Sequence, residues 1–145
     1  PPIYDEIYKG DINLLIIFLK KNIPILIPKN KNMRSFISAQ DLNNLIFKIL
    51  NHNNYLNNIF LISENSDVSS EDIILSLKNV LKSKSIIIKL PTMLQTMLFY
   101  MKVFPKFLES LFYSKRLDIS ETINTFNWEP KNNIIDQIKK KNANY

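Results

Sequence analysis

The sequence predicts an α/β fold that is mostly helical with a few short strands. Segments of helical periodicity alternate along the chain with short β-branched segments, a pattern that packs helices against parallel strands. The chain has 145 residues, of which 46% are hydrophobic, so it is long and apolar enough to form one core. The strands are too few and too short for a self-sufficient doubly wound sheet. We therefore expect residues 1–145 to form one lobe of a larger arrangement.

The first part of the chain predicts a helix followed by two strands. Hydrophobic residues cover most of the circumference of a helix over residues 11–21, so we expect this helix to be largely buried. Residues 23–28 are β-branched and bracketed by prolines, which favours an edge strand. A polar turn over residues 29–32 leads to a strand over residues 34–39, in which Phe36 faces inward.

Two helices in the middle of the chain begin with serine caps. Ser38 precedes a helix that runs to about residue 51, and Ser69 precedes a second helix with acidic residues in its first turn. Residues 58–62 and 85–90 have the apolar, β-branched pattern of strands. The helix residues expected to face the core are Leu42, Leu45, Ile46, Ile49, Ile73, Ile74, Leu77, Val80 and Leu81.

Residues 92–104 predict a third amphipathic helix, which begins directly after Pro91. Its methionines recur every four residues and therefore share one face: Met93, Met97 and Met101. Such a stripe more often packs in a core than it lines a cofactor site, so we expect these methionines to be buried.

The end of the chain predicts an extended segment and two short helices. Residues 117–119 are extended, Ser120 caps a brief helix that ends at Phe126, and a last helix covers residues 134–141. A lone tryptophan beside a turn, Trp128, is typical of a residue that plugs the core.

The composition excludes several classes of functional site. The chain has no cysteine, which excludes disulfides, thiolate metal sites and a cysteine nucleophile. His52 is its only histidine, which excludes a multi-histidine metal site. Gly10 is its only glycine, which excludes a glycine-rich phosphate loop within this chain. If the protein uses a nucleotide cofactor, the residues that grip its phosphates lie elsewhere.

The formal net charge of +6 comes from 19 basic and 13 acidic residues. The basic residues are scattered, and the densest run, at residues 139–141, is typical of a solvated helix end. A nucleic-acid-binding surface usually concentrates basic residues with aromatic residues between them, so we expect no nucleic-acid partner. A non-enzymatic basic module for nucleic acid or an anionic membrane surface stays open as the alternative function, because of the charge and the amphipathic residues 92–104.

The sequence carries no pattern for export or for membrane insertion. Its first residues lack a basic region followed by an apolar one, and no apolar run approaches the roughly 20 residues that span a bilayer. We therefore expect a cytoplasmic protein. Because the sequence does not begin with methionine, we expect it to start inside a longer protein.

Few side chains combine into a catalytic site. His52 lies in an asparagine-rich loop without a nearby serine or carboxylate pattern, so a solvated histidine is favoured over a general base. Glu71 and Asp72 are explained by their place at a helix N-terminus rather than as catalytic carboxylates. No tyrosine is followed four residues later by a lysine, the spacing that lowers a tyrosine pKa. We expect no catalytic residue in this chain.

Arg34 is the strongest candidate for ligand binding. It stands at the start of a strand, after a polar turn and before the apolar Phe36. Its guanidinium offers a rigid fork of donors that suits a phosphate or a diphosphate. The alternative is a structural ion pair with a carboxylate such as Asp41, and the sequence pattern alone leaves both open.

Four stretches follow one another along the chain in a recognisable order. They are Pro-Pro-Ile-Tyr at residues 1–4, Asn-Met-Arg-Ser-Phe-Ile-Ser-Ala-Gln-Asp-Leu at residues 32–42, Asn-Ile-Phe-Leu-Ile-Ser at residues 58–63 with Val-Ser-Ser-Glu-Asp-Ile at residues 68–73, and Leu-Asp-Ile-Ser at residues 117–120 with Asn-Trp-Glu-Pro at residues 127–130. Their order and spacing resemble the C-terminal half of extended short-chain dehydrogenases/reductases (extended SDRs), the NAD-dependent sugar-nucleotide epimerase/dehydratase family. The resemblance covers nearly the whole chain.

The resemblance implies the C-terminal substrate-binding lobe of an extended SDR, a Rossmann-type enzyme. The glycine-rich NAD site and the Ser/Tyr-x-x-x-Lys machinery of that family lie upstream, so NAD would be bound mainly outside this chain, and the chain alone should be inactive. The site residues that the resemblance implies are Arg34 for the nucleotide diphosphate; Leu26, Ile27 and Pro28 for the nucleobase; and Pro1, Pro2 and Tyr4 near the cofactor and the sugar.

The implied activity is epimerisation, reduction or dehydration at C4 of a nucleotide-activated sugar. The first residues and the helix after Ser69 are most similar to enzymes that act on UDP-N-acetylhexosamines for surface polysaccharide synthesis. The implied partner is the nucleotide-sugar substrate, and the complete enzyme could form a homodimer. The sequence departs from the family at Asp5 and Asn127, where glycine is usual, and at Gln40, where an acid is common. Asp5 is expected to distort the loop beside the sugar, because aspartate resists backbone angles that glycine allows.

Overall fold

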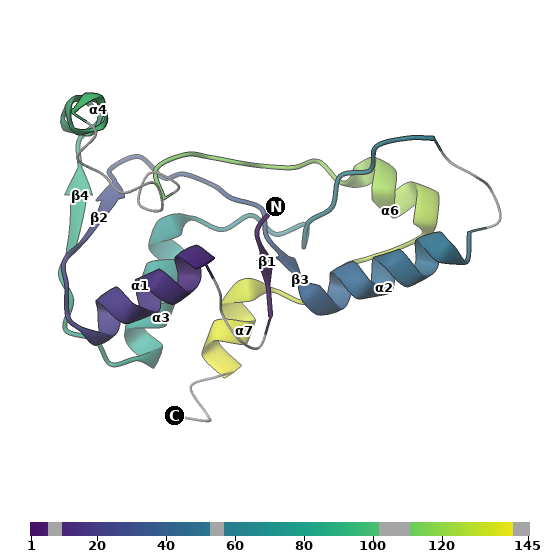
Figure 1. Ribbon diagram of the computed structural model, residues 1–145, viewed down its shortest axis with the longest axis horizontal. Helices are drawn as coiled ribbons and strands as arrows, with labels where there is room; N and C mark the ends of the chain where they lie inside the picture. Colours follow the sequence, from purple (N-terminus) through teal and green to yellow (C-terminus); the bar gives the residue numbers. More distant parts are fainter. Residues whose placement is uncertain (6–9, 53–56, 102–110, 141–145) are drawn as a thin grey trace.

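The computed structural model describes residues 1–5, 10–52, 57–101 and 111–140, which form an α/β fold of helices and short parallel strands (Figure 1). In chain order the elements are β1 Ile3–Tyr4, α1 Gly10–Lys20, β2 Ile25–Pro28, β3 Ile37–Ser38, α2 Ala39–Leu50, α3 Ser70–Val80, β4 Ile87–Leu90, α4 Thr92–Tyr100, α6 Ser120–Phe126 and α7 Ile134–Lys140. The predicted fold class, mostly helical with short strands, is confirmed.

The strands of the described residues pair into two separate parallel sheets of two strands each. β1 pairs with β3, with Ile3 opposite Ile37. β2 pairs with β4, with Ile25 opposite Ile87 and Pro28 opposite Leu90. Every strand is therefore an edge strand, which agrees with the prediction for residues 23–28 and explains why proline is tolerated there. A two-stranded sheet is stable only when other elements pack against it, so strands, helices and connecting segments share the core.

The larger core lies where α1, α3 and α7 come together. α1 contacts α3, and α3 contacts α7; in Figure 1 these three helices share the half of the molecule that holds β2 and β4. The buried hydrophobic residues of the three helices are Ile12, Leu15, Leu19, Ile73, Ile74, Leu77, Ile134 and Ile138. α1 is less buried than its composition predicts, because the side of the helix that carries Asn13 and Ile17 faces solvent.

A smaller core joins α2 to α6 at the other end of the molecule (Figure 1). Trp128 is buried there, which confirms its predicted role as a plug. Phe126 packs edge to face against Phe60, with ring centroids 4.8 Å apart, and against His52 at 5.4 Å. The prediction that His52 is a solvated loop residue is therefore wrong in part, because its ring packs on the core.

Serine caps begin two of the helices as predicted. The Ser38 hydroxyl accepts a hydrogen bond from the Asp41 amide at 3.0 Å. Ser69 and Asp72 form a reciprocal capping box at the start of α3. Ser120 is a correction, because Ile119 occupies the cap position of α6 and no side chain caps this helix. The Ser120 hydroxyl instead donates to the carboxylate of Asp118 at 2.6 Å.

The methionine stripe of α4 is also a correction. Met93, Met97 and Met101 are 90%, 58% and 58% exposed, and none of the residues Thr92–Tyr100 is buried. Periodicity correctly places the three side chains on one face, but this face stays exposed in the described part of the chain. Residues 102–104 of the predicted helix lie outside the described residues.

Two further expectations fail because they depend on partners rather than on local pattern. Residues 58–62 form no strand, since they pair with no ladder among the described residues. In α2, Leu45 is buried but Ile46 and Ile49 are 45% and 41% exposed, so only part of the predicted stripe reaches the core.

The two positions that depart from the family glycine behave differently. Asn127 has φ of 43° and ψ of 51°, a left-handed conformation that ends α6 and that asparagine tolerates. Asp5 is not among the residues with positive φ, so the distortion expected there does not arise from its own backbone angle.

Candidate functional site

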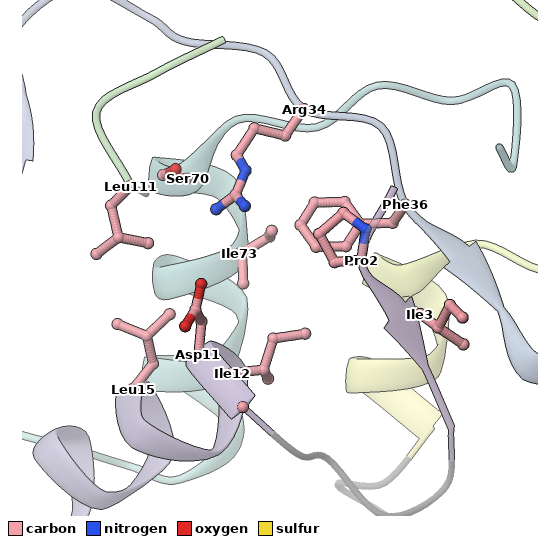
Figure 2. Close-up of a pocket in the computed structure, with 11 residues that line it drawn as sticks. Pro2, Ile3, Asp11, Ile12, Leu15, Arg34, Phe36, Ser70, Ile73 and Leu111 are labelled. Atoms are coloured by element: carbon pink, nitrogen blue, oxygen red, sulfur yellow. The ribbon is translucent and has the colours of Figure 1, made fainter. Parts of the chain in front are cut away.

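A cavity of about 350 Å³ opens between β1, α1, α3 and the segment that joins β2 to β3 (Figure 2). Its walls are mostly aliphatic and aromatic, with charged groups from only two side chains. The lining residues are Pro2, Ile3, Gly10, Asp11, Ile12, Leu15, Arg34, Phe36, Ser70, Ile73 and Leu111. A concave apolar site with a few converging polar groups is the usual form of a small-molecule site.

The backbone of Arg34 is held on two sides before its side chain enters the cavity. The Arg34 amide donates to the carbonyl of Val68 at 2.9 Å, and the Val68 amide donates back at 3.0 Å. On the other side, the amides of Ser35 and Lys115 bond to the carbonyls of Lys115 and Met33 at 2.8 and 2.9 Å. This double bridge holds the base of the arginine on a rigid frame, which is what a binding residue requires.

The side chain of Arg34 is 6% exposed and points into the cavity (Figure 2). Its Nε is buried and has no hydrogen-bond partner among the residues that the structure describes. The Cζ atom lies 5.5 Å from the centroid of the Phe36 ring, a cation–π contact. Burial lowers the pKa of Arg34, and the Asp11 carboxylate raises it in part. An arginine remains charged in proteins, so the cavity holds a cation whose donors are incompletely used.

The alternative of a structural ion pair between Arg34 and Asp41 is not realised. Asp41 is buried and accepts hydrogen bonds from Ser38 Oγ at 2.9 Å and from the amides of Lys131 and Asn132 at 3.1 and 2.9 Å. The ion pairs between described residues are Lys31–Asp72, Lys89–Glu71 and Arg116–Asp67, and Arg34 takes part in none of them.

Asn32 supports the cavity wall, although the sequence assigns it only to a polar turn. It is buried, and its Nδ2 donates to Ser70 Oγ and to the carbonyl of Leu111, both at 2.9 Å. Its Oδ1 accepts from the Ser70 amide at 3.3 Å. These bonds join the segment before Arg34 to the start of α3 and orient the Ser70 hydroxyl at the cavity.

Asp11 is the cavity residue that sequence reasoning missed. It occupies the first turn of α1, and its carboxylate points towards the guanidinium of Arg34 across the cavity (Figure 2). The available signal was an acid directly after the lone glycine, at the start of an apolar helix. That pattern predicts the start of a helix, but it cannot reveal which distant side chain the acid will face in the folded protein.

The other predicted site residues are distributed unevenly. Pro2 lines the cavity, whereas Pro1 and Tyr4 do not. Tyr4 is buried, and its hydroxyl donates to Glu64 Oε2 at 2.5 Å. Three residues predicted to lie against a nucleobase form part of β2 and lie outside the cavity lining: Leu26, Ile27 and Pro28.

The described residues contain no group of three or more acidic or histidine side chains placed to hold a metal ion. None of the helices described has the length and hydropathy that a bilayer crossing requires.

Comparison of the fold with solved structures yields matches that extend over almost the whole chain. A GDP-mannoheptose C4 reductase from Campylobacter jejuni, solved with NADP bound, matches with a TM-score of 0.66 and 15% identity, over 99% of this chain and 48% of the reductase. A UDP-N-acetylglucosamine 4-epimerase from Bacillus cereus matches with a TM-score of 0.67 and 12% identity, over 98% of this chain and 45% of that enzyme.

A UDP-glucose 4-epimerase from Thermotoga maritima, solved with UDP-glucose, gives a similar result. Its TM-score is 0.66 at 14% identity, over 98% of this chain and 42% of the epimerase. No protein-family model and no curated protein sequence matches the chain. The chain thus spans less than half the length of these three structures and shares its fold with that part of them. At the level of the fold, the predicted resemblance is confirmed.

Proposed function

We propose that the chain is the substrate-binding part of an NAD-dependent enzyme that epimerises, reduces or dehydrates a nucleotide-activated sugar. In this proposal residues 1–145 form the substrate-binding lobe, and Arg34 binds the diphosphate of the substrate. The shared fold supports the enzyme class, because the neighbours include sugar-nucleotide epimerases and a sugar-nucleotide reductase. The finer proposal is C4 chemistry on a UDP-sugar, in particular a UDP-N-acetylhexosamine for surface polysaccharide synthesis.

The observation that carries the proposal is the buried guanidinium of Arg34. The guanidinium enters a cavity whose walls are mostly apolar, with Asp11 as the other charged lining residue. A phosphate oxygen there would accept charge-assisted hydrogen bonds from the guanidinium in a site of low dielectric constant. The N-terminus of α1 also lines the cavity and adds a partial positive charge to the same region.

The residues of this chain do not fit the dinucleotide cofactor. A dinucleotide-binding turn needs several close glycines, whereas Gly10 is the single glycine of this chain, and an added Cβ there would meet no protein atom within 4 Å. One glycine cannot form such a turn. In this proposal, NAD is held by another part of the complete protein.

The role of this chain is then to bind and orient the non-reacting end of the substrate. Binding energy gained at the diphosphate holds the sugar against reactive groups elsewhere. The apolar walls around Arg34 exclude water and strengthen its attraction for a phosphate. A rigid position for the guanidinium matters because small displacements at the anchor change the position of the sugar.

The test is the binding of UDP-glucose to the 145-residue chain, measured by isothermal titration calorimetry. We expect Arg34→Ala to weaken binding by about tenfold or more, since a hydrogen bond to a charged group is lost. Arg34→Lys should be intermediate, because lysine keeps the charge but not the planar fork of donors.

The matched control is Arg116→Ala, which removes the other arginine of the chain. Arg116 is exposed and pairs with Asp67 at 2.7 Å outside the cavity around Arg34. We expect its replacement to leave the affinity nearly unchanged. Equal losses for the two variants, or no loss for Arg34→Ala, would overturn the assigned role.

The alternative function, a basic module for nucleic acid or an anionic membrane surface, gains little from the structure. The large exposed side chains of α4 are apolar, and residues Thr92–Tyr100 contain no lysine or arginine. Lys102, in the predicted helix over residues 92–104, lies outside the described residues. Binding to an anionic surface needs basic residues beside the apolar ones. We therefore retain the enzyme proposal.

A further inference from the structure

The cavity that holds Arg34 also holds a carboxylate aimed at it. Asp11 enters from the first turn of α1, and Arg34 enters from the segment before β3, so the two groups face each other across the cavity (Figure 2). The attraction of Asp11 acts on Arg34. A ligand that enters the cavity can therefore contact both charged groups.

Helix α1 stabilises the carboxylate in this position. The first turn of a helix carries a partial positive charge, which favours an acidic side chain there. Gly10, the residue before it, has φ of 60°, a left-handed conformation that glycine adopts without strain. The helix start thus sets Asp11 at the cavity independently of Arg34.

The two charges make different demands on a ligand. Arg34 can only donate hydrogen bonds, and an ionised Asp11 can only accept them. A bare phosphate or pyrophosphate would be attracted by Arg34 and repelled by Asp11, and apolar side chains such as Ile73 and Leu111 strengthen both effects. A phosphate attached to a hydroxyl-bearing sugar satisfies both groups, because its hydroxyls donate to the carboxylate.

We infer that Asp11 is a specificity-determining residue, which selects sugar phosphates over bare anions by accepting hydrogen bonds from the sugar hydroxyls and repelling unsubstituted phosphate. This inference rests on the proposed function, in which Arg34 holds the diphosphate. The inference adds a second polar contact for the ligand at the wall opposite Arg34. It also explains why an acidic residue lines a site for an anion. The substitution Asp11→Asn would keep the shape of the side chain and remove the repulsion.

The test compares UDP-glucose with inorganic pyrophosphate as ligands of the wild-type chain and of Asp11→Asn. Affinities are measured by calorimetry at one ionic strength. We expect Asp11→Asn to bind pyrophosphate more tightly and UDP-glucose more weakly, so that the ratio of the two affinities changes by about tenfold. Asp11→Glu keeps the charge and should retain most of the discrimination.

Two further variants serve as a control and as a replacement for Asp11→Asn. Glu121→Gln removes the same charge from the exposed surface of α6 and should leave the ratio unchanged. Asp11→Ser also suits a first helical turn and repeats the comparison if Asp11→Asn folds poorly. An unchanged ratio in both Asp11 variants, or an equal change in Glu121→Gln, would overturn the role of Asp11.

The outcomes separate this inference from the proposed function. If Arg34→Ala abolishes UDP-glucose binding but the Asp11 variants keep the wild-type ratio, only the selectivity of Asp11 is wrong. If wild-type chain fails to bind UDP-glucose, or binds it without Arg34, the proposed function fails and the role of Asp11 fails with it.

Discussion

Glu64 is a carboxylate enclosed between β1 and the start of α7. It is 5% exposed and accepts hydrogen bonds from the Tyr4 hydroxyl at 2.5 Å and from the Ile134 amide at 3.2 Å. Burial raises the pKa of Glu64 to about 7, although the bonds from Tyr4 and Ile134 lower it in part. Glu64 therefore joins β1 to α7 through its hydrogen bonds, and it changes its protonation state near neutral pH.

The stability of the protein should fall as the pH rises from about 4.5 to about 7. In this window the folded protein holds the Glu64 proton more tightly than the unfolded chain does, so raising the pH favours unfolding. The shift corresponds to at most about 3 kcal/mol. Urea unfolding midpoints at pH 5 and pH 8 would measure the effect.

The control is Glu64→Gln, which keeps an acceptor for Tyr4 but cannot titrate. It should flatten the pH dependence in this window. Asp72 does not interfere, because the Ser69 hydroxyl lowers its pKa, and its contribution is lost only at more acidic pH. A wild-type midpoint that stays constant between pH 5 and pH 8 would contradict the assignment to Glu64.

Helix α3 is the element that joins the cavity to the core. Ser69 caps its N-terminus, Ser70 and Ile73 line the cavity, and Leu77 is buried in the core. The Asn32 side chain ties the same end of the helix to the segment before Arg34. The geometry of the cavity thus depends on the stability of the first turn of α3.

Ser69→Ala should destabilise the protein by about 1 kcal/mol, because it removes the acceptor for the Asp72 amide and half of the capping box. Ser120→Ala provides a matched control. Ser120 looks like a cap in the sequence, but no side chain caps α6, so its loss should cost less than about 0.5 kcal/mol. Chemical unfolding of both variants measures the difference, and equal costs would contradict the role of the cap.

The whole molecule exposes apolar faces and matches less than half of each of the three neighbours compared. Large hydrophobic side chains are exposed on α2, at Phe47 and Leu50, and on α4, at Met93 and Tyr100. The chain covers 48%, 45% and 42% of the lengths of the three neighbours. These facts support the proposal that the chain works as a lobe against further protein.

The chain alone should therefore turn over no substrate. It lacks the Tyr-x-x-x-Lys spacing and the glycines of a dinucleotide site. Incubation of the purified chain with NAD and UDP-glucose, followed by chromatography of the sugar nucleotides, tests this, with a complete epimerase as the positive control. Any epimerised product from the chain alone would contradict the proposal.

The sequence of the complete protein offers a second test of the lobe proposal. We expect a glycine-rich strand–turn–helix and a Tyr-x-x-x-Lys segment there. Their absence from the complete protein would contradict the proposed role of this chain as a substrate-binding lobe.

Most helices and two of their caps could be predicted from the sequence, because periodicity and capping are local. The start of α2 at Ser38 and of α3 at Ser69 depends on residues within one turn. The prediction for residues 58–62 failed because a strand needs a partner, which the pattern does not contain. The methionines of α4 failed for a related reason, since a pattern shows which side chains share a face but not what covers that face.

The sequence by itself determined the fold class, the inward position of Phe36 and the choice of Arg34 as the candidate residue. Only the tertiary structure decided that Arg34 avoids Asp41, that Asp11 faces it, and that Tyr4 binds a carboxylate 60 residues away. The physical reason is the distance along the sequence over which each interaction acts. Helix periodicity and capping act within a few residues, whereas the burial and pairing of a charge depend on which distant segments close around it.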